Sequence, residues 1–298
     1  MQKSTLIRSL ILTAGLFAAV LPQIAAAQDA STPSQVPTIF VCGDSTSKNS
    51  GKGKDGDPVA GWGAPIAEFF DPTKAVVKNV GHAGKSSFTY YTGDWPRVLP
   101  QIQSGDFVLL VFGINDGSTP PGTGDAVAQV KGQPEHTYGW YMSTMAGDAR
   151  AKGAHVYLLT VTVRDIWNNP KVKYIDATPA GPLPPDYDPK EDKIERGTGN
   201  GRFTQWTKDV GQALHLPVLD LTNLSADKYE AMGRDQVSKL YSDHNHTYVP
   251  GAKIVAASIV SGLKAFNNSP FIPLLSAEGA AVPAADPKYV NDNAGPGN

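Results

Sequence analysis

The chain has 298 residues, of which 41% are hydrophobic and 18% are charged, and its formal net charge is −2. This composition is typical of a globular protein, and the length allows one large α/β domain or two smaller domains. The near-neutral charge disfavours nucleic-acid binding, because proteins of that class usually carry a clustered basic excess.

The first 27 residues have the pattern of a secretory signal peptide. Lys3 and Arg8 supply positive charge, an apolar run follows at 10–21, and alanines at 25–27 form a small-residue cleavage signal. The apolar run is shorter than the roughly 20 residues that a membrane-spanning helix needs, although a retained anchor is the alternative. We therefore expect a secreted or periplasmic protein with no membrane attachment after cleavage.

Five short apolar runs are each followed by polar or glycine-rich residues. The runs are continuous rather than alternating, which is typical of strands buried on both faces of a sheet. Helix-like stretches lie between them and predict right-handed crossovers and one parallel sheet with helices on both faces. The strands are expected at residues 38–42, 75–80, 107–112, 155–163 and 216–221, and the helices at 62–70, 96–103, 137–152, 203–214 and 251–266.

Three segments interrupt the strand–helix alternation. Residues 47–58 and 118–132 are rich in glycine and polar residues, and residues 171–201 contain five prolines and many charges. The last segment is too long for a plain connection and is expected to have a function or to be disordered. The tail at 269–298 is rich in Ala, Pro, Asn and Gly and predicts a loosely ordered extension. The folded domain is therefore expected at 28–268.

Polar clusters follow the predicted strands, where ligands of parallel α/β sheets usually bind. A fourth cluster comes just before the last predicted helix. All four are expected at one edge of the sheet. They are Gly43-Asp44-Ser45 after the first strand, residues 81–86 after the second, Gly113-Ile114-Asn115-Asp116 after the third, and Asp243-His244-Asn245-His246 before the helix.

The four clusters, in this order and spacing, resemble the conserved blocks of the SGNH (also called GDSL) hydrolase superfamily from about residue 38 to 266. Within it the chain resembles the rhamnogalacturonan acetylesterase group through the sequences at 136–141, 148–153 and 243–247. The resemblance implies a three-layer αβα fold. Its five-stranded parallel sheet would be flavodoxin-like, with strand order 2-1-3-4-5.

Serine needs an imidazole to take its proton, and a carboxylate to hold that imidazole, before it becomes a good nucleophile. Asp243 and His246 are three residues apart, so one loop or turn can bring the two side chains together. The resemblance assigns Ser45 as the nucleophile and Asp243 and His246 as its relay. It also assigns the oxyanion hole to the backbone N–H groups of Ser45 and Gly84 and the side-chain amide of Asn115. No metal or organic cofactor is needed for this chemistry.

The resemblance implies an exported serine esterase that removes O-acetyl groups from rhamnogalacturonan or a pectin-like polysaccharide through an acetyl-enzyme on Ser45. The partner would be an acetylated polysaccharide or oligosaccharide, and acetylxylan or another small ester is the alternative substrate. Ile114 stands where the acetylesterase group often has histidine, and residues 248–251 stand where it often has Ser-Pro-Ala-Gly. Both departures could reshape the acyl or sugar pocket, but neither replaces a catalytic group.

Other interpretations of the same residues predict different functions. Asp243, His244 and His246 could bind a metal, and residues 79–86 nearly match a phosphate-binding loop in which Asn79 replaces the first glycine. A sugar-binding protein without catalysis would not need the relay. An α/β-hydrolase would place its serine in a G-x-S-x-G elbow, which the sequence lacks.

Four aromatic residues near the expected sheet edge, and the single cysteine, also have simple structural interpretations. Four aromatic side chains near the expected edge could stack on a sugar, although packing in the core or at its rim is the simpler expectation. The single cysteine, Cys42, lies in an apolar run and is expected to be a buried hydrophobic residue. The four aromatic residues are Trp62, Tyr90, Tyr91 and Trp95.

Overall fold

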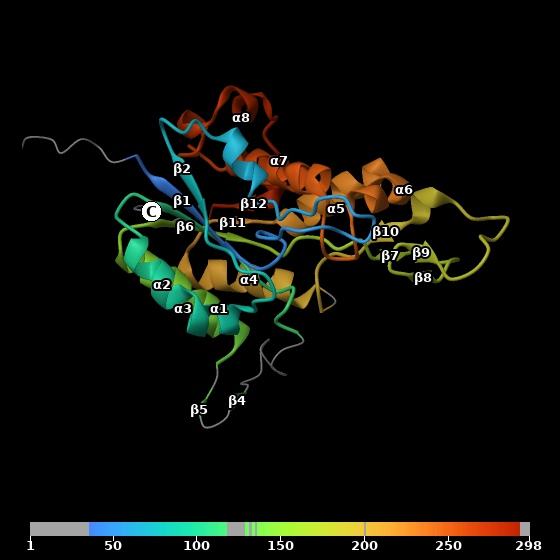
Figure 1. Cartoon of the computed structure of the whole chain (residues 1–298), viewed down its shortest axis with the longest axis horizontal. Helices are drawn as coiled ribbons and strands as arrows, with labels where there is room; N and C mark the ends of the chain where they lie inside the picture. Colours follow the sequence, from blue (N-terminus) through green and yellow to red (C-terminus); the bar gives the residue numbers. More distant parts are fainter. Residues whose placement is uncertain (1–35, 118–128, 131–132, 135, 200, 293–298) are drawn as a thin grey trace, which may run out of the picture. The chain divides into compact units, whose positions relative to one another are not determined.

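The described part of the chain comprises residues 36–117, 129–130, 133–134, 136–199 and 201–292 of a computed structural model. The predicted signal peptide at 1–27 and the segment 118–132, apart from 129–130, lie outside it. Figure 1 shows a central sheet with helices on both of its faces. The strands of this sheet are β1 (Thr38–Gly43), β2 (Val76–Asn79), β3 (Phe107–Val111), β6 (His155–Leu159), β11 (Val218–Leu219) and β12 (Val290–Asn291).

The strand order of the sheet is β12-β11-β6-β3-β1-β2, and every pair from β2 to β11 is parallel. Read from β2, the five parallel strands follow the order 2-1-3-4-5 that the resemblance implies, so the predicted fold class is confirmed. The predicted number of strands is wrong, because β12 adds a sixth strand antiparallel to β11.

The sixth strand corrects the expectation for the C-terminal tail. Residues 269–292 pack on the domain as η5 (Ile272–Leu274), α8 (Ala277–Ala281), η6 (Pro287–Tyr289) and β12. Phe271 is fully buried, and Val290 lies opposite Leu219 of β11. Although the tail is rich in Ala, Pro, Asn and Gly, its few large apolar side chains are enough to fix it, and β12 covers the open edge of β11. Residues 293–298 lie outside the described residues.

The central strands are buried on both faces, as their continuous apolar runs predict. Ile39 and Val41 of β1 face one core cluster, whereas Phe40 and Cys42 face the other. Cys42 is fully buried, and burial raises the pKa of its thiol to about 12. Each face of the sheet therefore needs its own layer of helices.

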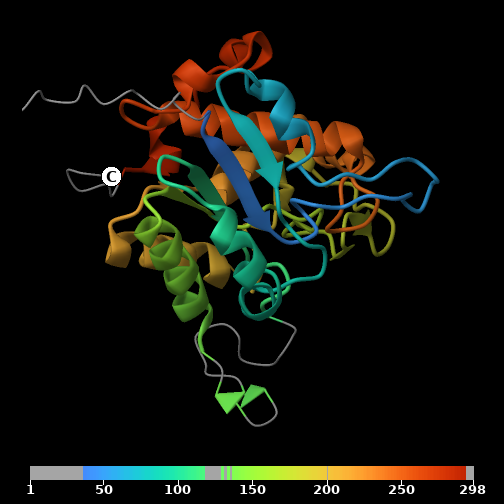
Figure 2. The same ribbon diagram turned by 60° about the vertical axis from the view of Figure 1, so that its left-hand side comes forward.

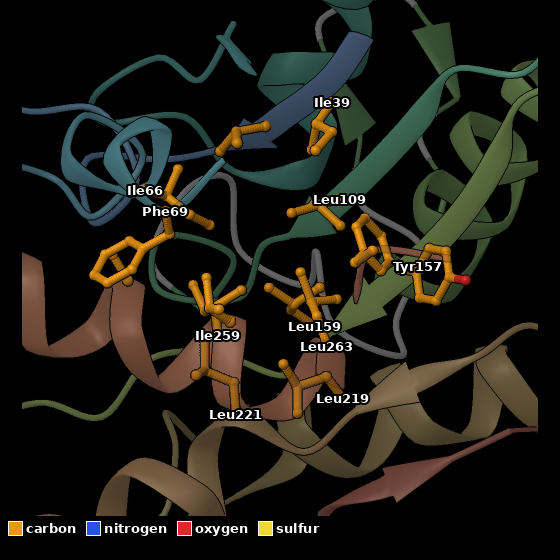
Figure 3. Close-up of a cluster of buried hydrophobic side chains, with 14 of the residues drawn as sticks. Ile39, Ile66, Phe69, Leu109, Tyr157, Leu159, Leu219, Leu221, Ile259 and Leu263 are labelled. Atoms are coloured by element: carbon orange, nitrogen blue, oxygen red, sulfur yellow. The ribbon is translucent and has the colours of Figure 1, made fainter. Parts of the chain in front are cut away.

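One helical layer consists of α5 (Leu221–Met232), α7 (Val249–Ala265) and the turn η1 (Pro65–Phe69), and Figure 3 shows its contact with the sheet. Ile259 and Leu263 of α7 lie there beside Leu109 and Leu159 of the strands. Figures 1 and 2 show the second layer on the opposite face. Its helices are α1 (Ser87–Gly93), α2 (Trp95–Val98), α3 (Tyr138–Ala151) and α4 (Arg202–Leu214). No helix in the described ranges is long and apolar enough to span a bilayer.

Several helices differ from those expected. The stretch 62–70 forms only the 3-10 turn η1, and 96–103 divides into α2 and η2 (Leu99–Gln101). Pro100 explains the division, because a proline lacks the N–H that would continue the helix. Helices α1 and α5 were not predicted from the apolar pattern. Both begin at a side-chain cap, supplied by Ser86 for α1 and Asp220 for α5.

The insertion 171–201 is folded through short strand pairs. Antiparallel pairs form between β7 (Trp167–Asn168) and β10 (Lys193–Ile194), and between β8 (Tyr174–Ile175) and β9 (Thr178–Pro179). A second hairpin, β4 (Gln129–Val130) with β5 (Gln133–Pro134), precedes α3. The remaining short elements are η3 (Pro189–Glu191), α6 (Arg234–Val237) and η4 (Ser238–Leu240).

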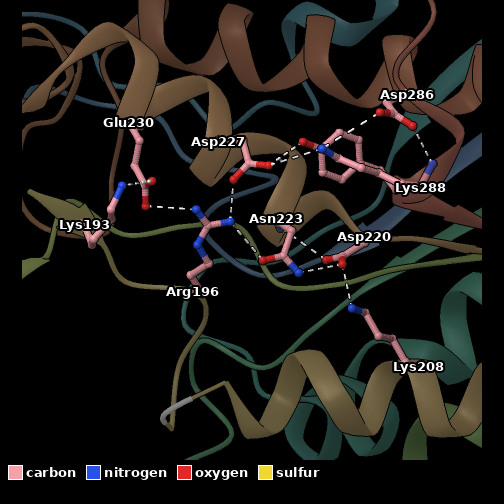
Figure 4. A network of polar contacts seen from close by, with 10 residues as sticks. Lys193, Arg196, Lys208, Asp220, Asn223, Asp227, Glu230, Asp286 and Lys288 are labelled. Atoms are coloured by element: carbon pink, nitrogen blue, oxygen red, sulfur yellow. Dashed lines mark hydrogen bonds and ion pairs between the residues drawn. The ribbon is translucent and has the colours of Figure 1, made fainter. Parts of the chain in front are cut away.

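Ion pairs attach the end of this insertion to α5, as Figure 4 shows. Arg196 pairs with Asp227 at 2.6 Å and with Glu230 at 2.9 Å, and Lys193 also pairs with Glu230 at 3.0 Å. Several linked charges hold a segment better than one exposed pair does. The insertion is therefore a structured part of the domain.

Candidate active site

Ser45 lies in a tight turn immediately after β1. The backbone N–H groups of Ser47 and Lys48 both donate to the carbonyl of Asp44, at 3.1 and 3.0 Å. Gly43 is required there, because a Cβ at this position would lie 2.8 Å from the Ser47 hydroxyl and from Val111. The turn presents the Ser45 side chain at the carboxyl end of the strand.

The carboxylate of Asp44 is buried inside this turn. It accepts hydrogen bonds from the backbone N–H and the hydroxyl of Thr46, both at 2.8 Å. Burial raises the pKa of Asp44 to about 6, although the bonds from Thr46 oppose the shift. Asp44 therefore stabilises the turn that carries Ser45.

His246 lies against Ser45 even though 201 residues separate them in the sequence. Its Nε2 is 2.9 Å from the Ser45 Oγ, and its Nδ1 is 2.8 Å from Oδ2 of Asp243. With the proton on Nδ1, the ring donates to Asp243 and leaves Nε2 to accept from the Ser45 hydroxyl. The structure thus brings together the three residues predicted as nucleophile and relay.

Asp243 is held in place by its own loop. Its Oδ1 accepts the backbone N–H groups of Asn245 and His246, at 2.7 and 2.8 Å. Partial burial alone would raise the pKa of Asp243, but the hydrogen bonds from the His246 ring and from these two N–H groups outweigh it and lower the pKa. The carboxylate therefore stays charged beside the imidazole at neutral pH.

The loop at 47–63 holds the segment around His246 against Ser45. The Thr247 hydroxyl donates to the Ala60 carbonyl at 2.9 Å, and the Ala60 N–H donates to the Thr247 carbonyl at 3.0 Å. The Tyr248 hydroxyl donates to the Asp55 carboxylate at 2.8 Å. Tyr248 is one of the residues where the chain departs from the acetylesterase pattern, and its role as an anchor was not predicted.

Ser45, Gly84, Asn115, Asp243 and His246 all line one cavity of about 570 Å³, which we call the serine pocket. Gly84 has a φ of +75°, which favours glycine, and no neighbour lies where its Cβ would be. Among the loop and turn hydrogen bonds of the described residues, the backbone N–H groups of Ser45 and Gly84 donate to no backbone carbonyl. The residues predicted to supply the oxyanion donors therefore line the same pocket as the relay.

Two side chains that follow β3, those of Asn115 and Asp116, bond the loop after β3 to the segment that carries Gly84. The Asn115 amide donates to the Lys85 carbonyl at 3.1 Å, which sets the orientation of the amide next to Gly84. Asp116 is fully buried and accepts both the N–H of Ser87, at 3.0 Å, and the Ser87 hydroxyl. Burial raises the pKa of Asp116 to about 7, against the opposing bonds from Ser87. The loops that carry Gly84 and Asn115 are thus bonded to each other.

The alternative metal site does not fit this geometry. Both ring nitrogens of His246 already contact side chains, and Nδ1 of His244 lies 3.5 Å from the Asp176 carboxylate instead of turning toward Asp243. Across the described ranges, no group of three or more His, Cys, Asp or Glu side chains is arranged to hold a metal ion. The residues fit a proton relay better than a metal centre.

The structure also bears on the phosphate-loop and sugar-stacking interpretations. The Lys85 Nζ lies 3.7 Å from the Asp94 carboxylate, so a carboxylate stands near the cation that would hold a phosphate. Trp62, Tyr90 and Trp95 are buried in the core, whereas Tyr91 is partly exposed. Tyr91 nevertheless packs against the same core cluster as Tyr90 and Trp95, so the simpler expectation of packing in the core or at its rim holds for all four aromatic residues.

Comparisons with known proteins agree with the geometry. Residues 41–254 match the GDSL-like Lipase/Acylhydrolase family. The chain is 26% identical to a rhamnogalacturonan acetylesterase of Emericella nidulans, over 76% of this chain and 84% of that protein. It is 24% identical to the rhamnogalacturonan acetylesterase RhgT of Bacillus subtilis, over 76% of this chain and 89% of the relative.

A solved structure shares the fold. The crystal structure of the protein YxiM from Bacillus subtilis superposes with a TM-score of 0.58 and 23% sequence identity. The match covers 76% of this chain and 56% of YxiM, so this chain corresponds to about half of that longer protein.

Proposed function

The chain belongs to the GDSL-like lipase/acylhydrolase family and is a carboxylic ester hydrolase, and on this premise we propose that it is an exported serine esterase that removes O-acetyl groups from a pectin-like polysaccharide. The observation that carries the proposal is the continuous contact from Asp243 through His246 to Ser45, with distances of 2.8 and 2.9 Å. A binding protein without catalysis would not require this alignment.

The proposed reaction begins with attack of the Ser45 Oγ on the ester carbonyl carbon. His246 Nε2 takes the serine proton as the new C–O bond forms, and Asp243 stabilises the imidazolium. The tetrahedral intermediate then collapses, the bond to the sugar oxygen breaks, and His246 donates its proton to that oxygen. The products of this half-reaction are the free sugar hydroxyl and an acetyl group on Ser45.

A water molecule completes the cycle. His246 takes a proton from the water as it attacks the acetyl carbonyl, and the second intermediate collapses as that proton returns to the Ser45 oxygen. The product that leaves is acetic acid, which releases its remaining proton to solvent and becomes acetate. In both halves, we propose that the backbone N–H groups of Ser45 and Gly84 and the side-chain amide of Asn115 stabilise the negative charge on the carbonyl oxygen.

The Asn115→Ala variant tests the proposed oxyanion donor. We expect kcat to fall on the order of 10²–10³-fold with KM little changed, because the oxyanion exists only after attack. Steady-state kinetics with p-nitrophenyl acetate, together with a thermal melt, measure both effects. If Asn115 only holds the loop through Lys85, the variant will melt at a lower temperature while its folded fraction keeps the wild-type kcat.

The substrate class of the proposal comes from the two relatives that are named rhamnogalacturonan acetylesterases. The partly buried side chain of Ile114 adds an apolar wall to the serine pocket, which suits a small acyl group. A panel of acetylated polysaccharides tests this proposal through the rate of acetate release. We expect the fastest release from acetylated rhamnogalacturonan. Faster release from acetylated xylan would reassign the substrate, and no release from any polysaccharide would refute the proposed function.

Export is supported by the charged, apolar and small-residue regions of residues 1–27. We propose that this segment is removed and that the enzyme acts outside the cytoplasm, where plant polysaccharides are found. N-terminal sequencing of the protein recovered from a producing cell tests the cleavage site, which we expect after Ala27.

A further inference from the structure

A second cavity, of about 620 Å³, lies directly beside the serine pocket. We call it the hairpin cavity because the β8–β9 hairpin supplies one of its walls. Ser242 and Asp243 line both cavities, so the relay loop is a shared wall between them. A ligand that occupied the hairpin cavity would therefore be next to the group reacting at Ser45.

The hairpin wall is held by hydrogen bonds from neighbouring segments. Asp176 at its tip has a φ of +53°, in the left-handed region that Asp and Asn occupy more often than most other non-glycine residues. The backbone N–H of Trp167 donates to the Asp176 carbonyl at 3.1 Å, and the Arg234 guanidinium donates to the Ala177 carbonyl at 2.9 Å. These bonds fix the tip and place the Asp176 carboxylate at the cavity.

The His244 side chain lies against the Asp176 carboxylate at the hairpin tip. Its Nδ1 lies 3.5 Å from Oδ2 of Asp176, and its carbonyl accepts the Asp165 N–H at 2.9 Å. The side chains of His244 and Asp176 are 38% and 55% exposed, so both remain accessible to a ligand. His244 thus belongs to the hairpin cavity, whereas its neighbour Asp243 belongs to the relay.

The polar groups of this cavity are mixed in charge and in hydrogen-bonding type. Donors and acceptors stand together around a small apolar surface from Ile175, Ala177 and Pro179. Such a lining suits sugar hydroxyls, which both donate and accept, and the carbon faces of a sugar ring. Three carboxylates in the lining disfavour a polyanion such as a phosphate ester. The donors include Lys54, Arg234, Ser238 and His244, and the carboxylates are Asp165, Asp176 and Asp243.

We propose that the hairpin cavity is a subsite for a sugar unit neighbouring the acetylated one, and that Asp176 and His244 bind its hydroxyl groups. This inference rests on the proposed esterase function and adds to it a role for the insertion 171–201. The enzyme would then recognise an acetylated oligosaccharide or polysaccharide chain rather than an isolated acetylated sugar. Asp176 and His244 determine specificity and take no part in bond breaking.

The test compares two substrates in the same variant. We expect Asp176→Asn and His244→Gln each to lower the ratio of kcat/KM for an acetylated oligosaccharide to kcat/KM for p-nitrophenyl acetate by about tenfold, or about 1.4 kcal/mol. The loss should fall mainly on KM for the oligosaccharide. Asparagine tolerates the left-handed conformation, so the first variant keeps the hairpin tip while removing the charge.

Asp186→Asn is the matched control, because Asp186 belongs to the same insertion, is 74% exposed, and does not line the hairpin cavity. Its ratio should equal that of the wild type. An unchanged ratio in both cavity variants would overturn the subsite while leaving the esterase function standing. If the wild-type enzyme cleaves p-nitrophenyl acetate but releases no acetate from any oligosaccharide, the proposed function and the subsite fall together.

Discussion

In the Ser45→Ala variant, we expect kcat for p-nitrophenyl acetate to fall by roughly 10⁶-fold, to the level that binding and the oxyanion donors alone provide. The Ser45 hydroxyl contacts His246 at 2.9 Å and is the atom proposed to carry the acetyl group. Without it the covalent route disappears. Steady-state kinetics at high enzyme concentration measure the residual rate.

The fold should survive this substitution. The turn is held by backbone bonds to the Asp44 carbonyl and by the Asp44 carboxylate, none of which involves the Ser45 side chain. We therefore expect a melting temperature close to that of the wild type. A variant that melts normally yet keeps most of its turnover would show that the nucleophile is another group.

The His246→Ala variant should lose activity to a similar extent, because no other imidazole reaches Ser45 in the described structure. The His244→Ala variant should lose far less on p-nitrophenyl acetate, since its ring lies toward Asp176 in the hairpin cavity. The comparison is well matched, because the two histidines are separated by one residue and receive the same substitution.

The two histidine variants also separate the relay from the alternative metal site. A shared metal would need both rings. Equal losses of activity in the two variants would therefore contradict a relay based on His246 alone. A large loss confined to His246→Ala, unaffected by a chelator, is the result that the relay requires. Kinetics with and without EDTA distinguish these outcomes.

The site could be predicted from the sequence because each of its side chains lies in a short pattern, either just after a strand or just before the last helix. Gly43-Asp44-Ser45 and Asp243-x-x-His246 are local signals, and the parallel strand order brings their loops to one edge of the sheet. The structure places Ser45, Asp243 and His246 in mutual contact and Gly84 and Asn115 in the same pocket.

The supporting contacts could not be predicted in the same way. The bonds of Ala60 to Thr247 and of Asp55 to Tyr248 join residues that are 187 and 193 positions apart, and nothing in either segment alone indicates its partner. The tip conformation of Asp176 likewise depends on Arg234, which lies far along the chain. Such contacts are consequences of the tertiary fold rather than of local patterns.

The prediction of secondary structure failed where composition was a poor guide to packing. Residues 269–292 are rich in small residues and proline, yet Phe271 is fully buried and β12 pairs with β11. Helix α1 has no long apolar stripe, and its start is fixed by the reciprocal cap between Ser86 and Thr89. A tail is ordered by a few well-placed apolar side chains, and a short helix by its cap, so neither gives a strong periodic signal.

Labelling with a fluorophosphonate tests whether Ser45 is an activated nucleophile. Such a reagent forms a stable bond only with a serine whose proton is taken by a neighbouring base. We expect one adduct per chain, located by peptide mass spectrometry on Ser45, that forms in step with the loss of esterase activity and is absent from Ser45→Ala. Complete inactivation of the wild-type enzyme with the label on any other residue would contradict the account.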